Sequence, residues 1–212
     1  MIFKRTLVIP AFVLLLTLLP VITQAQQPDP PSIGPCQVFP ADNPWNTDVS
    51  DPIKYPVHPK SETYIANINA HGGKSVHPDF GEDETYGIPW ATVTDSQPLV
   101  PVSFYYDEDS DPGPYPIPPT VPVEYGSDHH VLVVNTDTCI LYEMFDASFD
   151  GPPTNSWSAG SGAIFDLNSN ALRPEGLTSA DAAGLPILPG LARCDEVMVG
   201  EIDHALRFTV NR

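Results

Sequence analysis

The sequence has few basic residues. Nine lysines and arginines stand against 27 aspartates and glutamates in 212 residues, which gives a formal net charge of −18. A chain of this charge repels phosphate backbones, so binding to nucleic acid through a basic face is excluded. The same charge disfavours docking on anionic membrane surfaces. The partner is therefore expected to be neither a nucleic acid nor a membrane.

Several catalytic signatures are also missing. The sequence has no G-x-S-x-G motif, no phosphate-binding loop and no dinucleotide fingerprint, which disfavours a serine hydrolase, a nucleotide enzyme and a nicotinamide enzyme. Only three cysteines occur, Cys36, Cys139 and Cys194, and none has the C-x-x-C spacing of a structural zinc site. An odd number leaves one cysteine without an intrachain partner, and their pairing stays open.

Proline, by contrast, is abundant. The chain contains 26 prolines, which break helices and central strands, so neither a helical bundle nor a doubly wound parallel sheet is expected. Hydrophobic residues make up 42% of the chain, enough for a packed core. The composition predicts a mostly β fold, an antiparallel β-sandwich or jelly roll with long proline-rich loops and a few short helices.

Residues 1–25 have the pattern of a secretory signal peptide. Lys4 and Arg5 precede an apolar run, and Ala25 ends a cleavage pattern of small residues. The apolar run is short for a membrane span and is interrupted by proline. We therefore expect a secreted protein, extracellular or periplasmic.

The rest of the chain is predicted to form one domain. Residues 26–35 are a proline-rich leader, and residues 36–212 form a single β-rich domain. The alternating run Glu201–Arg212 predicts a final strand, with the chain ending directly after it. This ending favours a chain that is truncated at its C-terminus.

Three short helical segments are expected. The clearest is Ser61–Asn69, with Ser61 as its N-cap; a single helical turn follows at Ser179–Ala183, and a short helix at Asp195–Val199. The apolar residues of the first helix are expected to form its buried face: Tyr64, Ile65 and Ile68.

The segment His129–Phe145 gives the strongest structural signal. Two apolar, β-branched runs flank a turn at Asn135–Thr138, a pattern typical of a β-hairpin. A turn of two or four residues places His130 opposite Glu143. The alternation of side chains then puts Asp128 on the same face.

Asp128, His130 and Glu143 form the best catalytic candidate, and His204 joins them if the last strand lies beside the hairpin. In this hypothesis Asp128 orients His130, Glu143 is the acid or base, and His204 is a second proton carrier. Alternatively, His130, His204 and Glu143 could hold a divalent metal, the only cofactor that the sequence indicates. A purely structural pair of His130 with Glu143 is a third alternative.

Carboxylates and aromatic residues point to carbohydrate. Paired carboxylates are the machinery of most glycoside hydrolases, and a looser set comprises Glu143, Asp146, Asp166 and Glu196. Trp157 is expected in a loop, where an exposed ring could stack on a sugar. Substrate binding is assigned to three residues: Trp157, Asp166 and Arg173.

These features predict a carbohydrate-active protein, a polysaccharide hydrolase or lyase that uses carboxylate and histidine acid–base chemistry. Its substrate would be a polysaccharide or a cell-surface glycan. The alternative is a non-catalytic extracellular module that binds glycans or serves as a surface domain. A pocket joining the hairpin to the last strand would favour the enzyme, whereas a filled core there would favour the module.

Three segments carry a resemblance to known sequences: DPGPYPIPP, DHHVLVVNTDTCILYE, and the long block GSGAIFDLNSNALRPEGLTSADAAGLPILPGLARCDEVMVGEIDHALRFTV. Through them, most of residues 39–212 resembles a family of secreted bacterial proteins. Members of that family continue beyond the HALRFTV strand, which implies that the chain is a fragment. The resemblance transfers no catalytic role. It places the candidate residues within the shared pattern: Asp128, His130, Glu143, Pro189, Gly190, Leu191, Glu196 and His204.

Overall fold

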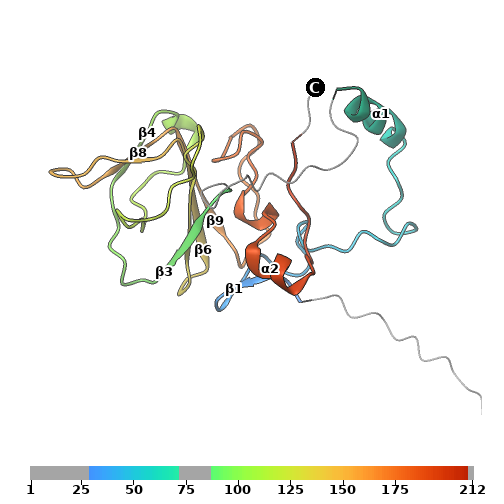
Figure 1. The fold of residues 1–212 in the computed structure, drawn as a ribbon, viewed down its shortest axis with the longest axis horizontal. Helices are drawn as coiled ribbons and strands as arrows, with labels where there is room; N and C mark the ends of the chain where they lie inside the picture. Colours follow the sequence, from blue (N-terminus) through green and yellow to red (C-terminus); the bar gives the residue numbers. More distant parts are fainter. Residues whose placement is uncertain (1–28, 72–86, 210–212) are drawn as a thin grey trace, which may run out of the picture.

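The structure, a computed structural model, describes residues 29–71 and 87–209. The expected signal peptide and the first residues of the leader lie outside these ranges. The described residues form sheets with a few short helices, which confirms the prediction of a β-rich fold (Figure 1). No helix within these ranges is long and apolar enough to cross a bilayer.

The larger sheet has four strands in the order β3-β5-β6-β9. Their bounds are Trp90–Val93 for β3, Val131–Asn135 for β5, Ile140–Phe145 for β6 and Ser161–Asp166 for β9. β6 is antiparallel to both β5 and β9, whereas β3 is parallel to β5. The sheet is therefore mixed and not wholly antiparallel, because the long connection from β3 to β5 permits a crossover.

Within that connection lies part of the smaller sheet, which has the order β4-β8-β7. β4 covers Val102–Phe104 and runs parallel to β8, Trp157–Ala159, while β7, Ser148–Phe149, is antiparallel to β8. Near the start of the described chain, β1 (Ser32–Ile33) and β2 (Cys36–Gln37) form a two-stranded hairpin.

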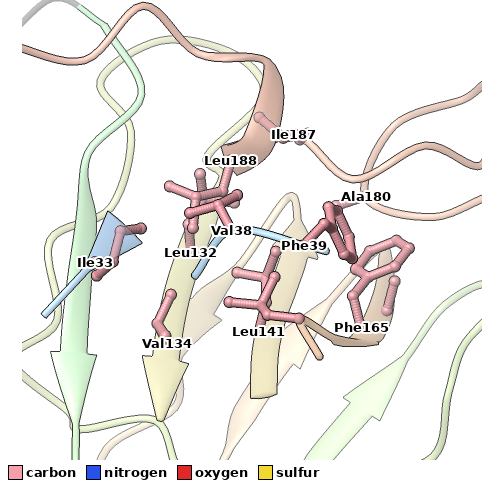
Figure 2. Close-up of a cluster of buried hydrophobic side chains, with 12 residues drawn as sticks. Ile33, Val38, Phe39, Leu132, Val134, Leu141, Phe165, Ala180, Ile187 and Leu188 are labelled. Carbon is pink, nitrogen blue, oxygen red and sulfur yellow. The ribbon is translucent and has the colours of Figure 1, made fainter. Parts of the chain in front are cut away.

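Both faces of the four-stranded sheet are covered, because every residue of β5 is buried. Successive side chains of a strand point to opposite faces, so alternate residues enter different clusters. On one face, Leu132 and Val134 pack with N-terminal residues and with the segment that carries Ile187, as Figure 2 shows. On the other face, Val131 and Val133 pack against Trp157 of the smaller sheet.

A disulfide joins Cys36 of β2 to Cys139, which follows β5, across 103 residues of sequence. It fastens the N-terminal hairpin to the turn of the β5–β6 hairpin. Cys194 is free and exposed. The pairing that the sequence left open is therefore Cys36 with Cys139.

The β5–β6 hairpin forms as expected, but its predicted register is wrong by two residues. The strands pair Asn135 with Ile140, and Leu132 lies opposite Glu143, where His130 was expected. The turn begins one residue later than predicted because Cys139 adopts a left-handed backbone conformation, with φ 56°, and remains in the turn. A shift of two residues keeps each side chain on its predicted face but changes every partner.

The helices are only partly as predicted. α1 covers Ser61–His71, yet none of its residues is buried, and Tyr64 and Ile65 are each 53% exposed. Figure 1 shows α1 lying away from the sheets, and the Tyr64 ring stacks on His58 instead of entering a core. α2 covers Cys194–Val199 and confirms the third prediction, beginning one residue earlier. Two 3₁₀ turns also occur: η1, Asp107–Asp109, and η2, Leu188–Gly190.

The single turn predicted at Ser179–Ala183 is confirmed only at its end: the Gly184 N–H donates to the Asp181 carbonyl at 2.9 Å and Gly184 closes the turn with φ 72°, whereas Ser179 and Ala180 are irregular. Residues 201–209 form no strand despite their alternation. Their backbone bonds to the rest of the described chain are isolated ones, from Glu201 to the Glu196 carbonyl, from Ala205 to the Trp45 carbonyl and from Arg207 to the Gly190 carbonyl.

Candidate functional site

The four residues predicted to be catalytic have separate hydrogen-bond partners. Asp128 is exposed and accepts a hydrogen bond from the Ser127 hydroxyl at 3.0 Å. His130 is buried, with Nδ1 2.5 Å from Glu124 Oε2 and Nε2 3.2 Å from the Ala180 carbonyl oxygen. Both ring nitrogens of His130 face oxygen acceptors. The ring thus connects Glu124 to the loop that contains Ala180 and leaves no nitrogen facing solvent.

Glu143 lies in the interior with no exposed surface. Its carboxylate accepts the backbone N–H groups of Ile187, at 2.9 Å, and of Leu188, also at 2.9 Å. Burial raises the pKa of Glu143 to about 7, although the two backbone hydrogen bonds and Arg207 act in the opposite direction. Glu143 thus ties the segment around η2 to the sheet, and no substrate reaches it from solvent.

His204 belongs to a third group, around α2. Its side chain is buried, and Nε2 lies 3.0 Å from Glu196 Oε1. Arg193 donates to the same carboxylate oxygen at 2.6 Å and is itself buried. These contacts cap the beginning of α2, and they do not bring His204 to the β5–β6 hairpin as the sequence analysis expected.

The proposed ligand set for a metal is likewise divided among these three groups. Among the described residues, no cluster of three or more histidine, cysteine, aspartate or glutamate side chains could hold a metal ion. His130, His204 and Glu143 instead contact Glu124, Glu196 and two backbone amides, respectively.

The three residues assigned to substrate binding also differ from expectation. Trp157 is 1% exposed, lies in β8 and packs its ring 5.4 Å from Phe149, so the prediction of an exposed loop aromatic is wrong. Arg173 is buried by its bonds to the Asp111 carboxylate and to the carbonyls of Asp109 and Thr178. Asp166 is exposed at the end of β9, where it accepts hydrogen bonds from Asn168.

The chain instead forms a hollow just before β5. It has a volume of about 490 Å³ and is lined by Val123, Glu124, Tyr125, Gly126 and His129. We call it the Tyr125 hollow, after the aromatic side chain that is 70% exposed at its wall. This hollow is open to solvent and combines an aromatic ring, an imidazole and a carboxylate.

His129 is held at this hollow by Asp146. The His129 Nδ1 atom lies 3.3 Å from Asp146 Oδ1, and both side chains are about half exposed. The backbones are joined as well, since the Asp146 N–H donates to the Asp128 carbonyl and the Ala147 N–H donates to the His129 carbonyl. These bonds extend the hairpin beyond its regular strands and fix the position of the imidazole.

The opposite wall is held by Glu124 and His130. The backbone N–H of Glu124 donates to the His130 carbonyl at 2.9 Å, while the Glu124 carboxylate receives both the backbone N–H and the Nδ1 side of His130. His130 therefore contacts a lining residue of the hollow, Glu124, although it does not line the hollow itself. Two histidine–carboxylate pairs thus contact the 123–129 segment: the largely buried His130–Glu124 pair and the exposed His129–Asp146 pair.

Glu124, Tyr125 and His129 were not among the residues predicted from the sequence, and Asp146 was predicted only as one of a loose set of carboxylates. One signal could have indicated them: the run VEYGSDHH places a carboxylate, an aromatic ring and two histidines around a glycine. An exposed ring beside fixed polar groups can stack on an apolar ligand face and bond its hydroxyls. Comparisons of this chain with protein-family models, with curated proteins and with solved structures found no match.

Proposed function

We propose that the chain is a secreted, non-catalytic carbohydrate-binding module that takes a polysaccharide or cell-surface glycan in the Tyr125 hollow. The observation that carries this proposal is the 70% exposed ring of Tyr125 beside a hollow of about 490 Å³. A sugar ring presents an apolar C–H face to an aromatic ring, and its hydroxyls reach the surrounding polar groups. His129 and Glu124 supply such groups at the same hollow.

The binding module is favoured over a hydrolase or lyase by the state of Glu143. A glycosidase needs two carboxyl groups flanking the scissile bond, both in contact with substrate. Glu143 has no exposed surface, and its oxygens are occupied by two backbone amides. Neither the Tyr125 hollow nor a second hollow beside β3 is lined by Glu143 or by residues 201–209.

The rigidity of the hollow also supports binding. Association is weakened when loops must be ordered at the moment of binding. Here the wall is held in advance by the largely buried Glu124–His130 contact and by the backbone bonds that Glu124, Asp146 and Ala147 donate. A glycan would therefore meet a site that is already formed.

The proposal also includes secretion of the chain and a β-sandwich architecture. Disulfides persist in oxidising compartments, so the Cys36–Cys139 bond supports secretion into the extracellular space or periplasm. Trp157 and Ala159 of the smaller sheet share a core with Val131 and Val133 of the larger one, which supports a β-sandwich as the finer description.

Binding of the secreted chain to an array of polysaccharides, followed by titration calorimetry with the soluble oligosaccharides that bind, tests the proposal. Tyr125→Ala should weaken binding about tenfold, because a stacked ring contributes roughly 1 kcal/mol beyond its buried area. Tyr105→Ala is the matched control, since Tyr105 is 82% exposed but does not line the hollow.

Equal binding by the wild type and Tyr125→Ala would contradict the proposed site. Release of soluble sugar products, lost in His129→Ala, would instead identify an enzyme at the same hollow. Failure of the folded chain to bind any glycan on the array would contradict the carbohydrate class.

A further inference from the structure

One edge of the four-stranded sheet is open. Within residues 29–71 and 87–209, β3 is the terminal strand and pairs only with β5. Val93 lies level with Asn135, and its carbonyl accepts the N–H of Thr136 at 2.9 Å. In a parallel ladder alternate residues bond to the same neighbour, so Ala91 and Val93 face β5. The N–H and C=O groups of Trp90 and Thr92 therefore point away from the sheet.

These outward groups receive no hydrogen bond from the described residues. Proteins usually protect such an edge with charged side chains, prolines or a covering segment. The run IPWATVT, residues 88–94, has no charged residue, although the chain carries 27 acidic ones. Its single proline precedes Trp90, and Thr92 is exposed. The centre of the edge is thus available to another extended backbone.

A second hollow adjoins the C-terminal end of this edge. It has a volume of about 350 Å³, and its polar lining comes from hydroxyl and amide side chains: Thr92, Thr94, Ser96, Gln97 and Thr136. Pro118 closes one side. An edge strand that leads into a neutral polar hollow offers backbone bonding along its length and a place for a side chain at its end.

Two exposed carboxylates lie beside the second hollow. The Asp95 N–H donates to Asp137 Oδ2 at 2.8 Å, and the Asn135 side-chain amide donates to Asp95 Oδ1 at 2.9 Å. These bonds hold Asp95 and Asp137 close together at the turn that follows β3. Their negative charge, within a chain of net charge −18, attracts a cation at this end of the edge.

We propose that the open edge of β3 binds an extended, basic peptide segment of a partner protein as a fifth strand of the sheet. The peptide backbone pairs with the outward N–H and C=O groups of Trp90 and Thr92, which is the mode of strand addition. A lysine or arginine of the peptide lies by Asp95 and Asp137. This interaction is separate from the Tyr125 hollow and does not depend on carbohydrate binding.

The charge of the chain favours a foreign peptide over a second copy at this edge. Pairing two copies would bring together two molecules of net charge −18, each with Asp95 and Asp137 at the contact. A basic peptide is instead attracted by the negative charge of Asp95, Asp137 and the rest of the chain. Backbone pairing accounts for affinity, and the carboxylates account for the preference for basic segments.

Calorimetric titration of the secreted chain with three synthetic nonapeptides tests this inference. The first alternates threonine and valine and ends in two lysines; the second has the same sequence with alternate backbone nitrogens methylated; the third ends in two glutamates. We expect saturable one-to-one binding of the first and at least a tenfold loss for each of the others. Methylation removes backbone donors without changing any side chain.

Two protein variants complete the experiment. Thr92→Pro removes an outward N–H without removing a β3–β5 bond and should weaken binding at least tenfold. Asp137→Asn keeps the acceptor for Asp95 but removes a charge, and should weaken the lysine peptide about threefold, whereas the exposed control Asp107→Asn should not change it.

Equal binding of the methylated and unmethylated peptides overturns strand addition, even if Thr92→Pro proves unable to fold. Absence of saturable binding to every peptide overturns the inference as well. A dimer of the wild type in sedimentation that dissociates in Thr92→Pro would assign the edge to a second copy instead.

Discussion

His129 and Asp146 face each other across the end of the β5–β6 hairpin, and both hold their backbones in the left-handed region, with φ of 47° and 49°. Residues other than glycine reach this region at an energetic cost, although histidine and aspartate tolerate it better than most. Such positions cluster at functional sites, where the surrounding structure compensates for them. His129 lines the Tyr125 hollow, so one of these two strained backbone positions lies at its wall.

The backbone strain predicts opposite effects for two substitutions at Asp146. Asp146→Gly should leave the free energy of unfolding unchanged or raise it slightly, because glycine adopts positive φ readily and the exposed contact with His129 contributes little. Asp146→Val should lower it by about 1–3 kcal/mol, since a β-branched residue is strained there. Urea unfolding measures both. The reverse order of stabilities would contradict the left-handed conformation at this residue.

Loss of the Cys36–Cys139 disulfide should destabilise the chain strongly. The bond closes a loop across 103 residues of sequence, for which the loss of chain entropy in the unfolded state predicts about 4–5 kcal/mol. The double variant Cys36→Ser with Cys139→Ser should therefore unfold at much lower urea concentration than the wild type. It should also release the N-terminal hairpin from the β5–β6 turn, detectable as faster hydrogen exchange in both segments.

Cys194→Ser is the matched control for this experiment. Cys194 is exposed and has no disulfide partner, so its replacement should leave the urea midpoint unchanged. If Cys194→Ser destabilised the chain as much as the double variant does, the assigned pairing would be wrong.

The strands of the hairpin could be predicted because burial on both faces leaves a clear sequence pattern. The register could not, since it depends on the turn, and a disulfide from a distant segment holds Cys139 within that turn. The same limit applies to the last strand. The sequence does alternate there, but a strand forms only beside another strand, and the backbone of residues 201–209 makes single bonds to Trp45, Gly190 and Glu196 instead.

The candidate site shows a related limit. Two consecutive histidines directly precede β5, and alternation alone assigned the functional role to His130. His129 interrupts the alternation by its left-handed backbone, so it lines the hollow while His130 turns inward to Glu124 and Ala180. The burial of Trp157 could not be predicted either. The sequence around it is polar and does not reveal that β8 packs against the larger sheet.

The buried carboxyl of Glu143 should make stability depend on pH. Burial raises its pKa from an ordinary value of 4.5 to about 7, so the folded chain holds this proton more tightly than the unfolded chain does. Its contribution to stability is therefore complete below pH 4.5 and is lost as the pH rises through about 7. The difference between the two pKa values corresponds to roughly 3 kcal/mol.

Urea unfolding at several pH values isolates this contribution when the wild type is compared with Glu143→Gln. Relative to the variant, the wild type should become less stable between pH 4.5 and 7 and then change no further. Glu143→Met should show the same pH dependence as Glu143→Gln but lower stability throughout, because it leaves the N–H groups of Ile187 and Leu188 unpaired. Parallel curves for the wild type and both variants would show that Glu143 does not titrate in this range.

The contact between β9 and the smaller sheet predicts a strong effect at Gly162. A Cβ atom there would lie 2.5 Å from the Phe104 ring and 2.8 Å from the Tyr115 hydroxyl oxygen, both far closer than real contacts allow. Tyr115 is fully buried and Phe104 packs in the same cluster, so neither ring can move aside freely. Gly162→Ala should therefore lower the free energy of unfolding by about 1–3 kcal/mol through overpacking. Adding Phe104→Leu should make room, so the double variant should be more stable than the sum of the single effects predicts, whereas strict additivity would show that the sheets do not meet at this point.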